Sequence, residues 1–187
     1  MGRKQARFNR SDTLRTQRRP ATRRTLIAPI KLVRAALSGG PYYVRLRRDR
    51  LVVRNASTGA RFDDKPIVVL SNGPKRRVVG VGAAATAASS TSINPFQHPR
   101  ILIADFLVAE ALLKYAFHAI SPRSWVQPSP IAVCHVVEPL EGGLSQIEAR
   151  ALMEMMEGAG ARQSFLWEGR ELSDAELRSG AYRAAGT

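Results

Sequence analysis

Cysteine and histidine are both scarce in this chain of 187 residues. The single cysteine, Cys134, cannot form an internal disulfide, which is typical of proteins in a reducing compartment. It lies in the apolar run Ile131–Val137, where we expect a buried structural thiol and not a nucleophile. The three histidines are far apart and match no metal-binding spacing; they are His98, His118 and His135. The composition therefore argues against a disulfide scaffold, a cysteine hydrolase and a zinc site.

Aromatic residues and long apolar runs are also few. Aromatics make up 6% of the chain, and no basic–aromatic motif of the kind that stacks RNA bases is present. No apolar run reaches the roughly 18 residues that a membrane span needs, and the N-terminus lacks the apolar core of a secretory signal. No Ser/His/Asp arrangement is recognisable. We therefore expect a cytoplasmic protein with no cofactor, no metal and no self-contained active site.

Acidic residues are nearly absent from the first 38 positions, which hold 11 Arg or Lys and one acid, Asp12. The remaining residues hold 18 basic and 14 acidic side chains, so most of the net charge of +14 belongs to this N-terminal arm. Residues 1–24 contain too little apolar surface to offset the entropy of ordering, so we expect a disordered arm. Its basic residues are Arg3, Lys4, Arg7, Arg10, Arg15, Arg18, Arg19, Arg23 and Arg24.

Three interpretations of the arm stay open: contact with phosphates of nucleic acid or lipid, a solvated extension, and translation that truly begins further downstream. Residues 25–38 differ from the rest because apolar side chains recur near helical spacing before Gly39 and Gly40. This pattern predicts an amphipathic, cationic helix. Such a helix can lie on an anionic membrane surface or dock on its own domain.

From Pro41 the apolar period becomes two, which indicates strands. Tyr42–Leu46 and Leu51–Asn55 flank the polar turn Arg47–Arg50, so we expect a hairpin. Pro66–Leu70 and Arg77–Val81 are predicted as a third and a fourth strand of the same meander. A short helix is expected at 83–88, followed by a Ser/Thr-rich loop through Ser92.

Helical spacing then returns twice, around one buried strand at Ile131–Val137. The first long helix is expected from Ile101 or Asp105 to Ile120. The second begins at Ser145, whose spacing to Glu148 is that of a capping box, and stops at Gly158–Gly160. The remaining expected elements are a strand at Gln163–Trp167, a short helix at Leu172–Leu177 started by Ser173, and a flexible tail at 180–187.

Two blocks of residues carry a family resemblance. The first is Ile103-Ala-Asp-Phe106 followed by Glu110, and the second is Ile147-Glu-Ala-Arg-Ala151 with Gly158-Ala-Gly-Ala-Arg162. In order and spacing they resemble the first subdomain of MreB, the rod-shape-determining bacterial actin, over about residues 42–168. The resemblance implies one actin-like (RNase H-like) subdomain at 41–179, with a mixed sheet of five to six strands and flanking helices. Its motif positions are Asp105, Phe106, Glu110, Glu148, Arg150, Gly158 and Gly160.

The departures from this family are equally informative. Actin-like ATPases carry an Asp-x-Gly-Thr phosphate loop between their first two strands, whereas the turn here is Arg47–Arg50, with no glycine. By the resemblance, the family's second half would begin after Gln163–Trp167, so this chain has one wall of the nucleotide cleft. Glu148 matches the glutamate that positions attacking water in the family. We prefer helix capping for Glu148 and for Asp105, and a solvated turn for Asp49.

The sequence therefore favours a non-enzymatic interaction protein related to MreB, in cell-shape or envelope-synthesis machinery. Expected partners are MreB-type filaments or envelope-synthesis proteins, and the inner face of the membrane through residues 1–38. Two alternatives stay open. One is half of a split ATPase, completed by another chain and using Glu148; the other is a nucleic-acid-binding protein that acts through the basic arm.

Overall fold

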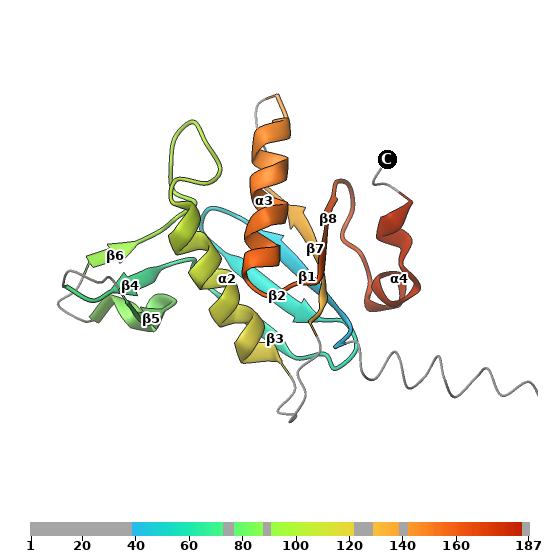
Figure 1. The fold of residues 1–187 in the computed structure, drawn as a ribbon, viewed down its shortest axis with the longest axis horizontal. Helices are drawn as coiled ribbons and strands as arrows, with labels where there is room; N and C mark the ends of the chain where they lie inside the picture. The colour runs from blue at the N-terminus through green and yellow to red at the C-terminus, as the bar shows by residue number, and fades with distance from the viewer. Residues whose placement is uncertain (1–38, 73–76, 88–90, 122–128, 139–141, 185–187) are drawn as a thin grey trace, which may run out of the picture.

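A five-stranded mixed sheet forms the centre of the molecule (Figure 1). The structure is a computed structural model that describes residues 39–72, 77–87, 91–121, 129–138 and 142–184. The strand order is β3-β2-β1-β7-β8, in which β1, β7 and β8 are parallel and β2 is antiparallel to both β1 and β3. The expected mixed sheet is thus confirmed. Its strands are β1 (Pro41–Leu46), β2 (Leu51–Asn55), β3 (Arg61–Asp64), β7 (Ile131–Val136) and β8 (Gln163–Trp167).

A second, three-stranded antiparallel sheet has the order β5-β4-β6. It contains β4 (Val68–Leu70), β5 (Val78–Val81) and β6 (Thr91–Ile93), with the 3-10 helix η1 (Ala83–Ala87) packed on it. The single meander expected from sequence is therefore wrong in two places. The strand that follows β2 is β3, whose sequence Arg-Phe-Asp-Asp holds one apolar residue, and the end of the loop predicted through Ser92 forms part of β6. Both are edge strands, so pairing with a neighbour and not burial defines them.

Helices α2 (Phe106–Ile120) and α3 (Gln146–Gly158) cover one face of the large sheet. Because side chains alternate along a strand, Tyr42, Val44 and Leu46 of β1 point toward these helices. On α2 the buried side chains recur at helical spacing and include Leu112, Leu113, Ala116 and Phe117. This main core also receives Val68 and Leu70 of β4, so the second sheet packs against α2 (Figure 1).

The opposite face of the large sheet is covered by α4 (Asp174–Ser179) and the 3-10 helix η2 (Ala181–Arg183). Tyr43 and Val133 of the sheet pack there against Leu172, Leu177 and Tyr182. Residues 180–184, which belong to the tail that the sequence analysis expects to be flexible, include η2 and pack on this face. Gly180, with φ +82°, ends α4, and the chain then turns to bury Tyr182 to 3% exposure. Residues 185–187 lie outside the described residues.

The predicted basic arm at 1–38, including the helix expected at 25–38, also lies outside the described residues. Within the described ranges, no helix is both long enough and apolar enough to cross a membrane. In Figure 1 the second sheet and α4 lie at opposite ends of the molecule, with the helix pair and the large sheet between them.

Candidate functional site

The turn Arg47–Arg50 lies at the carboxyl end of β1, beside the carboxyl end of β7. This end of a parallel sheet is where layered α/β proteins usually bind ligands. Here the turn is held from three directions. The Arg47 amide donates to the Arg50 carbonyl at 3.0 Å, the Arg48 amide donates to Glu138 Oε2 at 3.3 Å, and Asn94 Nδ2 donates to the Arg48 carbonyl at 2.8 Å. Two amides that a phosphate loop would offer to a ligand are thus engaged with the protein.

Arginines around this turn are largely paired with acids. Arg50 forms a bidentate pair with Asp63, at 2.7 and 2.8 Å, and Arg61 also contacts Asp63. The Arg50 guanidinium lowers the pKa of the Asp63 carboxyl below its usual value. Arg45 pairs with Glu171 at 3.0 Å. The small cavity among these side chains has a volume of about 60 Å³, against about 300–1,000 Å³ for typical ligand sites. Asp49 is exposed, as the sequence predicted.

The two motif blocks meet between α2 and α3. Glu148 Oε1 accepts a hydrogen bond at 3.0 Å from the amide of Leu102, in the segment that leads into α2. Its other oxygen accepts from the Ser145 amide at 3.2 Å and from Ser145 Oγ at 2.7 Å, which completes the predicted capping box. The Leu102 amide is the largest cause of a lowered pKa at Glu148. Both carboxylate oxygens of Glu148 therefore already accept hydrogen bonds from other groups of the protein.

The other motif positions also have structural contacts. Asp105 caps α2, its Oδ1 accepting from the Val108 amide at 3.1 Å. Gly158 lies directly against Glu110, because a Cβ atom placed on Gly158 would be 2.6 Å from Glu110 Cδ. The rest of the set includes Phe106, which is partly buried against the core, Arg150, which pairs with Glu154 at 2.8 Å, and Gly160, with φ +113°. The blocks thus join two helices, a contact that sequence spacing alone did not reveal.

The side chains of His98, His135 and Cys134 are either hydrogen-bonded or buried within the fold. His98 Nδ1 accepts from the amides of Arg100 and Ile101. His135 is buried, lies 2.7 Å from the Tyr43 hydroxyl, and has a pKa lowered by burial. Burial also raises the pKa of the Cys134 thiol to about 12, which keeps it protonated and unreactive. Among the described side chains, no group of three His, Cys, Asp or Glu could hold a metal ion.

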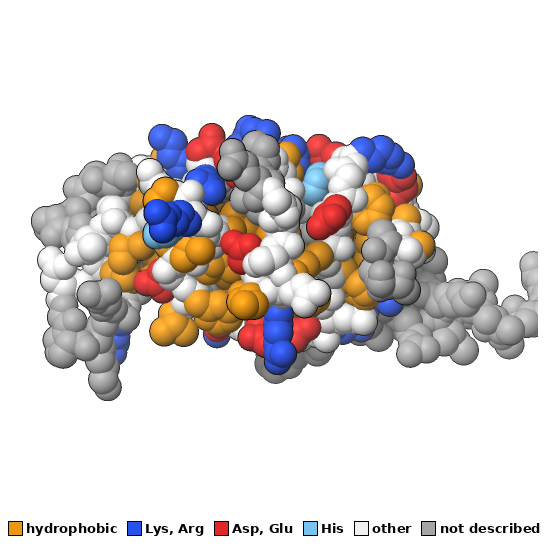
Figure 2. All heavy atoms as spheres, turned by 90° about the horizontal axis from the view of Figure 1, so that it is seen from above, with side chains coloured by type: hydrophobic (Ala, Val, Ile, Leu, Met, Phe, Trp, Pro, Cys, Tyr) orange, Lys and Arg blue, Asp and Glu red, His pale blue; other side chains and the backbone are white. Residues whose placement is uncertain are grey.

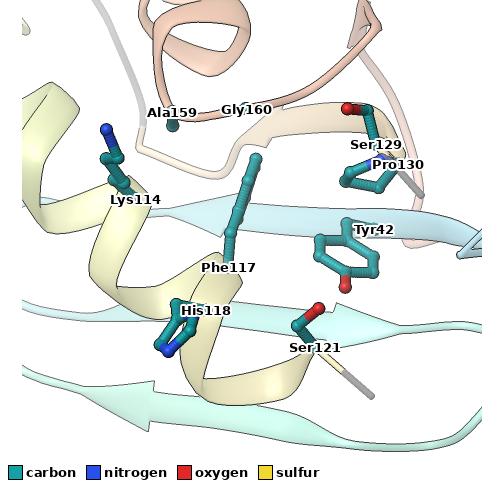
Figure 3. Close-up of a pocket in the computed structure, with 9 residues that line it drawn as sticks. All are labelled: Tyr42, Lys114, Phe117, His118, Ser121, Ser129, Pro130, Ala159 and Gly160. Atoms are coloured by element: carbon teal, nitrogen blue, oxygen red, sulfur yellow. The ribbon is translucent and has the colours of Figure 1, made fainter. Parts of the chain in front are cut away.

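A cavity of about 210 Å³ lies at the opposite end of the sheet, between the C-terminal ends of α2 and α3 (Figure 3). Figure 3 shows the Tyr42 hydroxyl, which comes from β1, pointing toward Ser121, while Lys114 and His118 come from α2. The rings of Tyr42 and Phe117 meet edge to face, with centroids 5.3 Å apart. Burial raises the pKa of Tyr42. No sequence motif indicated this cavity, since its lining comes from four separate segments.

Exposed apolar side chains gather near the N-terminal ends of α2 and α3. Leu107 is 75% exposed, Ile147 83% and Ile101 44%. Ile101 and Ile147 each precede one partner of the hydrogen bond between Leu102 and Glu148, which brings the two segments together. We call these three residues the helix-end patch. Figure 2, which looks along α3 from the end where its N-terminus lies, shows hydrophobic side chains across the middle of this face.

Replacement of Glu148 tests its structural role. We expect Glu148→Ala to lower the free energy of unfolding by about 1–3 kcal/mol, because the amides of Leu102 and Ser145 both lose their acceptor, while Ser145 still caps α3. Glu148→Gln, which keeps one acceptor oxygen, should cost less. Urea denaturation measures both, and an unchanged Glu148→Ala would contradict the role.

The Glu148 contribution should also depend on pH. Because the folded state lowers its pKa, the stabilisation is present above the unfolded pKa of about 4.3 and is lost as the pH falls through the folded value. The advantage of the wild type over Glu148→Gln should therefore shrink on acidification below about pH 4. An advantage that grows in acid would exclude this explanation.

The chain was compared with protein-family models, with curated proteins and with solved structures. No protein-family model matches the chain. It is similar to the cell shape-determining protein MreB of Escherichia coli (strain K12), with 35% identity over 103 residues, which are 51% of this chain and 28% of MreB. The chain thus spans less than a third of the length of that relative.

Two further proteins are similar to the chain. The uncharacterized protein YjaA of Escherichia coli (strain K12) is 32% identical over 122 residues, which cover 63% of this chain and 74% of YjaA. The crystal structure of MreB5 of Spiroplasma citri bound to ADP covers 68% of this chain and 38% of that protein, with a TM-score of 0.51 and 18% identity, and shows the fold alone. The chain therefore belongs to one family with YjaA and is an MreB-like, actin-related protein that corresponds to part of MreB.

Proposed function

We propose that this chain is a non-catalytic relative of MreB that acts in the cell-shape machinery by binding an MreB-type filament. In this proposal it works in the cytoplasm, at the inner face of the membrane. The observation that carries the proposal is the helix-end patch, where three large apolar side chains remain exposed next to the contact between the two motif blocks. Contiguous exposed apolar patches mark sites of protein–protein interaction.

The absence of catalysis is proposed from the surroundings of two features. The turn Arg47–Arg50 has no glycine and uses two of its amides internally, and Glu148 holds structural donors on both oxygens. In this proposal, the turn does not bind a phosphate group and Glu148 does not position an attacking water molecule. Binding of Mg-ATP by the isolated chain at micromolar affinity would contradict this part of the proposal, and binding only with a partner chain would support a split ATPase instead.

Co-sedimentation with polymerised MreB from the same cell tests the binding. We expect the full chain to pellet with filaments, and the double variant Leu107→Glu with Ile147→Glu to bind at least about tenfold more weakly, because two charges replace apolar contact area. Removal of residues 1–38 should leave pelleting intact.

Val79→Glu is a control that introduces a charge at an exposed apolar position elsewhere on the surface. Val79 is 59% exposed and lies on β5 of the second sheet, away from the helix-end patch. Its substitution should leave pelleting unchanged. Equal losses in both variants, or pelleting that depends only on residues 1–38, would place the interaction elsewhere and overturn the proposal.

A further inference from the structure

A third cavity, of about 270 Å³, lies between the start of β1 and the C-terminal segment. Its walls come from Gly40 and Pro41, from the turn after β2, from the start of β8, and from α4 and η2. Three arginines line it: Arg162, Arg178 and Arg183. We call it the arginine pocket. It is separate from the turn Arg47–Arg50, since the pocket adjoins the beginning of β1 and the turn adjoins its end.

The positive charge of this pocket is uncompensated. None of its described lining residues is acidic, and within the described part of the chain none of the three arginines forms an ion pair. All three residues are exposed, so their guanidinium groups are accessible. The arginines near the hairpin turn differ in this respect, because Arg45, Arg50 and Arg61 are paired with carboxylates. The pocket therefore offers a local charge of about three for an anion.

Two of the arginines are held in place by other contacts. One guanidinium nitrogen of Arg178 donates to the Ala56 carbonyl at 2.6 Å. The guanidinium of Arg183 lies over the rings of Phe165 and Tyr182, at 5.1 and 5.5 Å from their centroids. A guanidinium has five N–H donors, so a single bond or a stacked face leaves donors free for a ligand. Fixing the side chains in advance reduces the entropy lost when an anion binds.

The wall opposite α4 is also fixed. Asn55 is fully buried; its side chain donates to the Gly39 carbonyl at 3.2 Å and accepts from the amides of Ser57 and Thr58. Gly40 has φ +69°, and a Cβ atom there would lie 2.3 Å from Ser57 Oγ, so only glycine fits. This arrangement keeps the Ser57 hydroxyl on the wall of the pocket, where it can donate to an anion.

The sequence that precedes Gly39 is strongly basic. Residues 1–38, which precede Gly39, contain 11 Arg or Lys and one acid. Their charge adds to the attraction of anions to the protein. We propose that the arginine pocket binds a phosphate group, carried either by a small soluble phosphomonoester or by a phospholipid headgroup. A phosphomonoester carries up to about two negative charges and a phospholipid phosphodiester carries one; in both, the phosphate oxygens suit bidentate pairing with guanidinium groups.

The experiment uses the full chain and titrates it with inorganic phosphate, glycerol 3-phosphate and acetate by calorimetry. In parallel, it measures flotation with phosphatidylcholine vesicles with and without phosphatidylglycerol. We expect at least one phosphate-bearing probe to bind, with acetate weaker. Arg162→Gln with Arg183→Gln should weaken that binding by about tenfold or more. Among the described residues, the Arg162 side chain forms no ion pair. The single variant Arg162→Gln should therefore weaken binding without changing the melting temperature.

The matched control is Arg77→Gln with Arg100→Gln, which removes the same charge from exposed positions outside the pocket. It should change binding less than about twofold at moderate salt. If the arginine variants lose binding to the soluble phosphates, the ligand is a free phosphomonoester. If they lose binding only to phosphatidylglycerol vesicles, the ligand is a lipid headgroup. Equal loss in the control pair, binding only to long polyanions such as DNA, or no binding to any phosphate probe would overturn the proposal.

Discussion

Removal of residues 172–187 is expected to abolish cooperative folding. The segment buries Leu172, Leu177 and Tyr182 to 1–3% exposure against Tyr43 and Val133. Each such side chain contributes about 1.5–3 kcal/mol, and their sum approaches the whole stability of a typical domain, about 5–15 kcal/mol. The Leu172 amide also donates to the buried Tyr43 hydroxyl at 3.2 Å. Circular dichroism on heating should show no cooperative transition for the truncated chain.

The control for this truncation removes only residues 185–187. That chain keeps Tyr182, as well as the bond from Arg178 to the Ala56 carbonyl. It should melt within about 2 °C of the full chain, since the contacts between the C-terminal segment and the sheet are retained. A fully folded chain lacking residues 172–187 would mean that the second face of the sheet is stable without cover.

Leu102→Ala is expected to lower the free energy of unfolding by about 2–5 kcal/mol. Leu102 is fully buried in the main core although it lies outside regular secondary structure. Its truncation leaves a void beneath the segment that carries the chain into α2, and it also loosens the backbone that Glu148 holds. Urea denaturation followed by tryptophan fluorescence gives the value.

The preceding residue provides an internal control. Ile101 is 44% exposed, so Ile101→Ala should change stability by less than about 0.5 kcal/mol. If the helix-end patch binds filaments, however, Ile101→Ala should weaken co-sedimentation. Similar destabilisation by both substitutions would show that burial does not distinguish these neighbours.

The elements with strong local signals could be predicted from the sequence. The hairpin β1–β2 follows from alternating apolar residues around a polar turn, and α3 follows from its capping box and terminal glycines. The start of α2 at Asp105 was one of two predicted positions, and the side-chain cap selects it over Ile101. In each case the information lies within a few residues of the element.

The elements that depend on distant partners could not be predicted in the same way. Strand β3 has one apolar residue and is defined by pairing with β2 and by the ion pair of Asp63 with Arg50. Assignment of β4 to a second sheet depends on its pairing with β6, whose sequence, Thr-Ser-Ile, resembles a loop. Tyr182 gives no local sign of burial, because it packs on a sheet face made of strands that are separate in the sequence, among them those that carry Tyr43 and Phe165.

The candidate sites show the same division. Sequence spacing identified the capping role of Glu148, because Ser145 is only three residues away. It could not identify the tether to Leu102 or the contact of Gly158 with Glu110, which need the packing of two helices. The arginine pocket was missed for a similar reason. Arg162 directly precedes β8, Arg178 lies in α4 and Arg183 in η2, and the fold brings them to one pocket.

The parallel pairing of β1 with β7 has a consequence for folding kinetics. Tyr42 is opposite Ala132, and the Tyr43 hydroxyl meets His135 across 92 positions of the chain and Leu172 across 129. High contact order slows folding, because long loops must close before these contacts form. During synthesis, the central strand β1 therefore stays without its parallel partner until most of the chain has left the ribosome. Its apolar edge is then a natural substrate for chaperones, and slow translation before β7 would lengthen that exposure.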